Sequence, residues 1–186
     1  MRVRLLIAVL ISLLGAALLV SAAAHAATQV RRVQVEVPGP MSTPPTPAGT
    51  LTLDFVFKNK RGSKRKFTPR QLTRIDFSQV PLHCFGPNNS TSILLFTRTF
   101  ATQVKVMKLP NPSGRRPKPG RFAFNFVYNF ADFTGTISGV IDKRNGKGAP
   151  MSQGKLRIQD LDADPGHMNC NSNGLFAWGR LPLTPV

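Results

Sequence analysis

Strict alternation of aromatic and smaller side chains along residues 121–130 constrains the fold more than any other feature of this sequence. In RFAFNFVYNF the aromatic residues take every second position, namely Phe122, Phe124, Phe126, Tyr128 and Phe130. Side chains at alternate positions of a β-strand share one face, and five rings on one face need a core to pack against. The pattern therefore predicts a strand in a packed sheet.

The same two-residue period recurs along the chain, whereas no segment shows an apolar helical stripe over three turns. About nine short strands joined by Gly, Pro and Asn turns predict an all-β fold, a single-domain antiparallel β-sandwich. Two inward positions of one strand are glycines, Gly135 and Gly139, which we expect to make room for a facing sheet. Two prolines in the last six residues discourage pairing there. The predicted strands cover 31–37, 51–58, 70–77, 92–100, 104–109, 121–130, 133–142, 154–160 and 174–180.

The first 26 residues are organised like an export signal. Arg2 and Arg4 precede an uncharged apolar stretch, Leu5 to Val20, and Ala24-His25-Ala26 supplies the small-x-small pattern of a cleavage site. An uncleaved membrane anchor is the alternative, because the extended apolar stretch approaches the ~20 residues that span a bilayer. The sequence thus predicts an extracytoplasmic protein with a signal peptide at 1–26, an N-terminal strand and Pro-rich connection at 27–50, and the β-sandwich at 51–186.

Export would place the two cysteines, Cys84 and Cys170, in an oxidising compartment, where they most simply form a disulfide. A zinc site is the alternative, since His83 and His167 lie close to the cysteines in the sequence and could complete a Cys2His2 set. In an extended segment, however, His83 and Cys84 point to opposite faces. The disulfide is therefore the preferred interpretation.

Few side chains are available for catalysis. Without residues 1–26 the chain keeps two His, two Cys and one Glu, and it has no Gly-x-Ser-x-Gly motif. A carboxylate pair could come from Asp54, Asp76 or Asp132, but each of these fits a strand face or a turn. We therefore expect no enzymatic activity and no cofactor.

Three aspartates alternate near the C-terminus, at Asp160, Asp162 and Asp164. Alternate oxygens of this kind can converge on a calcium ion, as at the start of an EF-hand loop. The match then fails at Pro165, where an EF-hand needs glycine, and at Asn171, where it needs glutamate. A solvated acidic turn is the simpler interpretation.

Positive charge dominates the surface chemistry, because the chain carries 25 Lys and Arg against 8 Asp and Glu, a formal net charge of +17. If the predicted basic turns meet at one end of the sandwich, they form a positive surface able to bind teichoic acid, acidic polysaccharide, phospholipid head groups or extracellular nucleic acid. The alternative is that basic turns only maintain solubility and discourage edge pairing. Specific nucleic-acid recognition is not expected, because the aromatic residues that could stack on bases fall on buried faces. The candidate residues are Lys58, Lys60, Arg61, Lys64, Arg65, Lys66, Arg115, Arg116, Lys118, Arg121, Lys143, Arg144 and Lys147.

Several short motifs give the chain a family resemblance. They are Val-Pro-Leu-x-Cys at Val80 to Cys84, Phe-Thr-Gly-Thr-Ile-Ser-Gly at Phe133 to Gly139, and Cys-Asn-Ser-Asn-Gly at Cys170 to Gly174, followed by Trp178. With the Arg/Ala signal, these motifs resemble small exported β-rich proteins of high-GC Gram-positive bacteria. The resemblance implies export and a β-rich fold, and it implies no activity.

Together these features predict an exported, disulfide-linked, non-catalytic binding or structural module of the cell envelope. Its expected partner is an anionic envelope polymer or a membrane surface. One alternative is a secreted enzyme or enzyme inhibitor that uses the loops near Cys84 and Cys170. A third hypothesis is a membrane-tethered module that retains residues 1–26.

Overall fold

The computed structural model describes residues 28–39, 48–59, 67–110, 120–129, 133–143, 149–160, 168–172 and 176–186. The predicted signal peptide, 1–26, lies outside these residues. Within them, no helix is long and apolar enough to cross a lipid bilayer. A short 3-10 turn, η2 (Pro87–Asn89), accompanies eleven strands: β1 (Thr28–Val37), β2 (Gly49–Asn59), β3 (Phe67–Phe85), β4 (Thr91–Lys105), β5 (Met107–Lys108), β6 (Arg121–Asn129), β7 (Phe133–Asp142), β8 (Met151–Asp160), β9 (Asn169–Asn171), β10 (Phe176–Pro182) and β11 (Thr184–Pro185).

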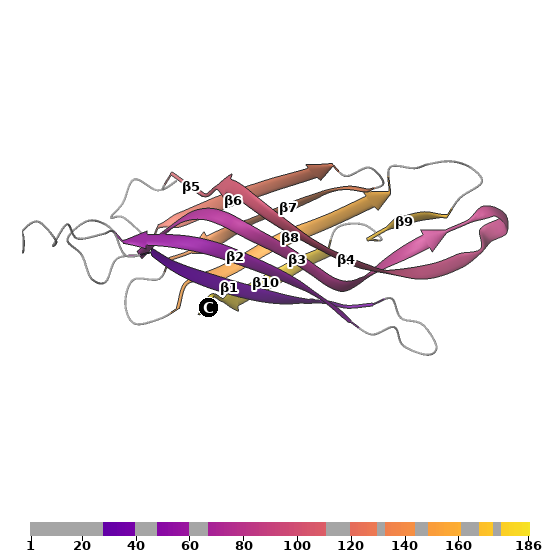
Figure 1. Ribbon diagram of the computed structural model, residues 1–186, viewed down its shortest axis with the longest axis horizontal. Coiled ribbons are helices and arrows are strands. Elements are labelled where there is room, and N and C mark those ends of the chain that lie inside the picture. Colours follow the sequence, from indigo (N-terminus) through magenta and orange to yellow (C-terminus); the bar gives the residue numbers. More distant parts are fainter. Residues whose placement is uncertain are drawn as a thin grey trace, which may run out of the picture.

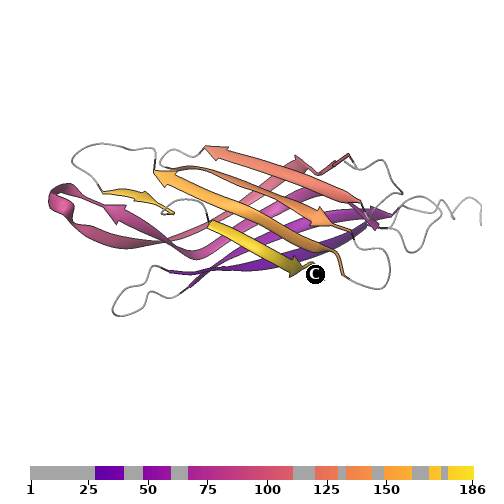
Figure 2. The ribbon, with the colours of Figure 1, turned by 180° about the vertical axis from the view of Figure 1, so that it is seen from behind.

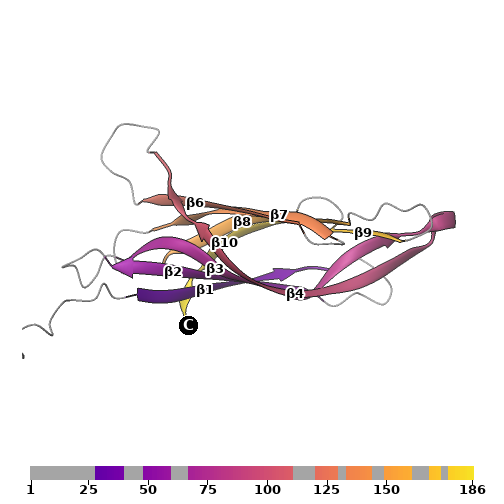
Figure 3. The same ribbon diagram turned by 45° about the horizontal axis from the view of Figure 1, so that its top comes forward.

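The strands form one antiparallel sheet that folds over into two layers (Figures 1 and 3). Its main path runs β11-β1-β2-β3-β9-β8-β7-β6-β5, while β4 pairs with β3 and β10 pairs with β8. Figure 3 shows β6, β7 and β8 above β1, β2, β3 and β4. Figure 2 shows β10 lying beside β8 on the back of the molecule. The prediction of an all-β, antiparallel, sandwich-like fold is confirmed.

The structure differs from the predicted strands in length and at the C-terminus. The predicted strand 70–77 belongs to a strand of 19 residues, β3, and β9 and β11 were not expected. The expectation that the last two prolines discourage pairing is wrong, because Pro185 lies opposite Arg31 of β1 and Pro182 lies opposite Met151 of β8. The pairing of Pro185 is at the edge of the sheet, where a missing N–H breaks no ladder. The backbone N–H of Val186 still donates to the carbonyl oxygen of Val30 at 3.2 Å.

The core lies between the layers and is rich in aromatic contacts. As the alternation predicts, Leu51, Leu53, Phe55 and Phe57 of β2 are all fully buried. Rings then meet across the layers, with Phe55 of β2 5.0 Å from Phe124 of β6 between ring centroids. Edge-to-face pairs of this kind add to the stabilisation that burial alone provides. The β6 alternation therefore marks the inner face of the second layer.

Glycines in the second layer make room for aromatic rings of the neighbouring strands. Phe124, Gly139, Gly154 and Trp178 lie directly opposite one another on β6, β7, β8 and β10. A Cβ at Gly139 would lie 2.6 Å from Cζ of Phe124, and one at Gly154 would overlap the Trp178 ring. A Cβ at Gly135 would similarly meet the hydroxyl of Tyr128 on β6. The expectation that Gly135 and Gly139 make room for the facing sheet is thus corrected, because the space is filled from within the same layer.

The substitution Gly154→Ala is expected to lower the free energy of unfolding by about 1–3 kcal/mol, because the new methyl group must displace the Trp178 ring or the sheet. Urea unfolding followed by circular dichroism measures the loss. Gly179→Ala on β10 is the matched control, since no heavy atom lies within 4 Å of a Cβ there. Equal effects of the two substitutions would contradict this packing.

Alkaline pH is expected to destabilise the fold through the single tyrosine, Tyr128. Burial raises the pKa of Tyr128 well above its ordinary value of about 10. The folded state holds the phenolic proton more tightly than the unfolded state does. The stability that the protonated Tyr128 contributes is therefore complete below about pH 10 and is lost as pH rises further. Absorbance of the phenolate during an alkaline titration should therefore appear only as the chain unfolds.

Tyr128→Phe provides the control for this titration. The Tyr128 hydroxyl is buried without a hydrogen-bond partner among the described residues, so its removal is expected to leave stability at neutral pH unchanged or slightly higher. The variant should also lose less stability above pH ~10 than the wild type. Parallel losses in both proteins would show that other groups cause the alkaline sensitivity.

Candidate functional site

The strand ends that flank the predicted basic turns lie at one end of the sandwich, on the left in Figure 1. Three backbone hydrogen bonds connect them. The N–H of Val106 donates to Arg70 O at 2.9 Å, that of Leu109 to Arg121 O at 2.8 Å, and that of Lys143 to Gly120 O at 3.0 Å. These bonds join the start of β3 to the end of β4, and the start of β6 to its neighbours. Lys58 of β2 lies opposite Thr28, so the chain also enters β1 at this end.

Three of the predicted polyanion-binding residues are in the described structure, and all three are at this end. Lys58 and Arg121 are exposed, whereas Lys143 is half-buried. The remaining candidates lie outside the described residues: Lys60, Arg61, Lys64, Arg65, Lys66, Arg115, Arg116, Lys118, Arg144 and Lys147.

The structure adds three exposed basic residues that the sequence analysis missed, Arg70, Lys105 and Lys108. Arg70 and Lys105 lie where β3 begins and β4 ends, and Lys108 of β5 is opposite Phe122. Each stands apart from the basic runs in the sequence, so a search for runs cannot find it. Only the pairing of β3, β4, β5 and β6 brings them together. We call the combined surface the basic end: Lys58, Arg70, Lys105, Lys108, Arg121 and Lys143.

Acidic side chains neutralise arginines more than lysines in the described part of the chain. Asp142 pairs with Arg121 at 3.1 Å and with Arg180 at 3.4 Å between nitrogen and oxygen. No described acidic side chain forms an ion pair with Lys58, Lys105 or Lys108. Lys58, Lys105 and Lys108 therefore keep their charge available to solvent or to a ligand.

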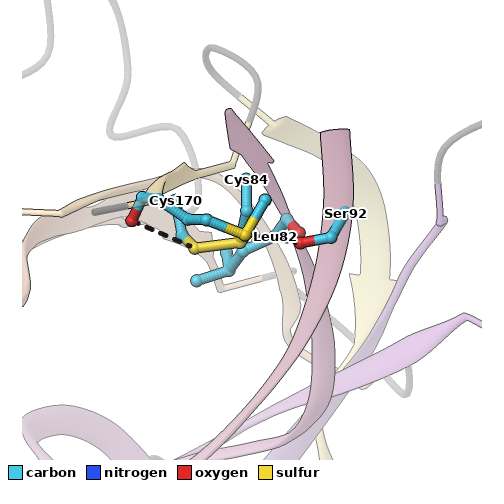
Figure 4. Close-up of a disulfide and its surroundings, with 5 residues drawn as sticks. Leu82, Cys84, Ser92 and Cys170 are labelled. Carbon is cyan, nitrogen blue, oxygen red and sulfur yellow. Dashed lines mark hydrogen bonds between the residues drawn. A yellow bond between two sulfur atoms is a disulfide. The ribbon is translucent and has the colours of Figure 1, made fainter. Parts of the chain in front are cut away.

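The predicted disulfide is confirmed and lies toward the opposite end. Cys84 of β3 is bonded to Cys170 of β9, as Figure 4 shows, closing a sequence separation of 86 residues. Because both sulfur atoms are bonded to each other, neither can ligate zinc, and the zinc alternative is wrong. His83 lies on the other face of β3, with its ring stacked on Phe85 at 6.4 Å between centroids.

The predicted calcium site lies largely outside the described residues. Asp160 ends β8, while Asp162 and Asp164 are outside the described structure, so the calcium hypothesis stays a prediction. No group of three His, Cys, Asp or Glu side chains suited to a metal ion occurs in the described segments. A shallow hollow over Gly139 and Gly154 is lined by small and aliphatic residues, by the rings of Phe124 and Trp178, and by Gln153 and Lys155.

Removal of the disulfide is expected to lower the free energy of unfolding by up to about 4–5 kcal/mol, the chain-entropy figure for a loop of this length. The double variant Cys84→Ser and Cys170→Ser tests this in urea. A reducing agent should destabilise the wild type by the same amount and leave the double variant unaffected. A wild type insensitive to full reduction would contradict a stabilising role.

Comparisons with protein-family models, with curated proteins and with solved structures find no significant match to this chain.

Proposed function

We propose that this protein is a non-catalytic binding module of the cell envelope, which holds an anionic polymer at its basic end. The observation that carries the proposal is the convergence of the strand ends that flank all three basic runs. Through this convergence, residues far apart in the sequence can act on one ligand together.

Electrostatics supports a polyanion as the ligand. The chain carries a net charge of +17, and Lys58, Lys105 and Lys108 of the basic end form no ion pair with a described acidic side chain. Clustered charge of one sign attracts a polymer of the opposite sign and releases its condensed counterions. A repeating anion such as a phosphate-linked wall polymer offers several charges at once. Such binding depends on charge spread over a surface and needs no deep pocket.

Export remains part of the proposal. The disulfide between Cys84 and Cys170 is compatible with an oxidising compartment, where envelope polymers are accessible. The enzyme or inhibitor alternative uses the loops near this disulfide. Near the disulfide, the ring of His83 is stacked on Phe85, and no described acidic or basic side chain contacts this histidine. No specific observation therefore favours the enzyme or inhibitor alternative.

The double substitution Lys105→Glu and Lys108→Glu is expected to weaken binding to teichoic acid roughly 25-fold at low salt. This figure assumes about 1 kcal/mol for each basic side chain near an anionic surface. Binding should also fall steeply as salt rises, because the release of condensed counterions into a more concentrated salt solution gains less entropy. Titration of labelled polymer over a salt series measures both effects, with DNA and anionic vesicles as competing polyanions.

Lys155→Glu with Arg157→Glu is the matched control. Both residues are exposed on β8, and this pair changes the net charge by the same amount away from the basic end. The control should retain most of the binding. If both double variants weaken binding equally, only net charge matters, and the proposed site is wrong.

A further inference from the structure

The β3–β4 hairpin ends in a tip that differs chemically from the rest of the molecule. Residues 77–97 contain no Asp, Glu, Lys or Arg, although 33 of the 186 residues of the chain are charged. Large apolar side chains are nevertheless exposed there: Phe85 (48%), Ile93 (37%), Leu94 (40%) and Leu95 (42%). The tip extends beyond the other strands, at the right of Figure 1 and far from the basic end. Exposed apolar surface of this kind marks an interaction site.

The tip also presents an open sheet edge. β4 pairs with β3 along one side, and no described strand pairs with its other side along residues 91–97. The segment TSILLFT is rich in residues that favour strands, and it contains neither proline nor a charged side chain. Prolines and charged side chains normally protect an edge strand from pairing with another chain, and an edge without them can accept a further strand. The occupant should therefore be another β-strand.

The charge distribution favours a second copy of this chain as the source of the strand that pairs with β4. Two molecules of net charge +17 repel each other wherever their basic surfaces meet, and the uncharged tip is the place where they can approach at the lowest electrostatic cost. Antiparallel pairing of two tips would point the two basic ends in opposite directions.

Strand register supports self-pairing as well. Opposite residues of an antiparallel pair share a face, so a twofold axis at Leu94 places Leu94 opposite Leu94 and Ile93 opposite Leu95. Apolar side chains then meet on both faces of the joined sheet. We propose that the protein forms a twofold dimer in which β4 of one copy pairs antiparallel with β4 of the other through residues 91–97. This inference goes beyond polyanion binding and does not depend on it.

Sedimentation equilibrium of the chain as recovered from an expressing host, with its mass verified, tests the proposal. We expect a concentration-dependent dimer that becomes tighter as salt rises, because salt screens the repulsion between the basic ends. This trend is opposite to the one expected for polyanion binding, so the two proposals can fail separately. A chain that stays monomeric at high protein concentration in high salt overturns the dimer.

Leu94→Lys places two like charges at the twofold axis and should weaken dimerisation at least about tenfold. Val127→Lys is the matched control, because Val127 is 62% exposed on β6, away from the tip, and it should leave the dimer unchanged. Leu95→Lys offers a second tip variant should Leu94→Lys fail to fold, which the fluorescence of Trp178 reports. Equal dimerisation of the tip and control variants would overturn the proposal. Binding of a monomeric wild type to uncharged lipid vesicles, lost in Leu94→Lys, would overturn it in favour of a lipid anchor.

Discussion

The pairings of β3 hold the two layers together. Along one part of its length β3 pairs with β2 of the first layer, ending at Ser78, and from His83 it pairs with β9, which leads to the second layer. Between these positions Gln79 adopts a φ of 53°, and its N–H donates to Oγ1 of Thr97 at 3.0 Å. The pairing of β3 with β4 shifts its register between Phe77 and Val80, which marks a β-bulge at this point. A β-bulge bends the strand and changes its direction. The covalent bond from Cys84 to Cys170 then fixes the second pairing, so that the core is enclosed from both sides.

The outer face of the first layer shows how this chain distributes its few acidic residues. Arg32 and Asp54 lie opposite each other on β1 and β2 and form two hydrogen bonds, of 2.7 and 2.8 Å, which raise the pKa of Arg32. Arg74, next in the same row on β3, contacts Asp76 at 3.6 Å. Aspartates thus stabilise arginines within the sheet, where a planar guanidinium suits a carboxylate. Lys58, Lys105 and Lys108, at the ends of described strands, form no ion pair with a described acidic side chain.

Sequence periodicity predicts the strands and much of the core, because successive side chains of a strand point alternately into the core and toward solvent. The valines of β1 and the aromatic residues of β6 illustrate this, since burial alternates as the pattern requires. Periodicity cannot predict which strands become neighbours. The role of Gly154 beneath Trp178, the crossing of β3 at Gln79 and the addition of Arg70 to the basic end all depend on pairing between distant segments. The disulfide was predictable because only two cysteines are available to pair.

The pairing of β11 with β1 joins the two extremes of the described chain. The guanidinium of Arg31 donates to the carbonyl oxygen of Leu183 at 3.1 Å, across 152 positions of sequence. A chain synthesised from its N-terminus therefore leaves this edge of β1 uncovered until residues 184–185 have been made. The first strand of the sheet is thus the one whose outer edge is covered last, after all the other described strands have been synthesised.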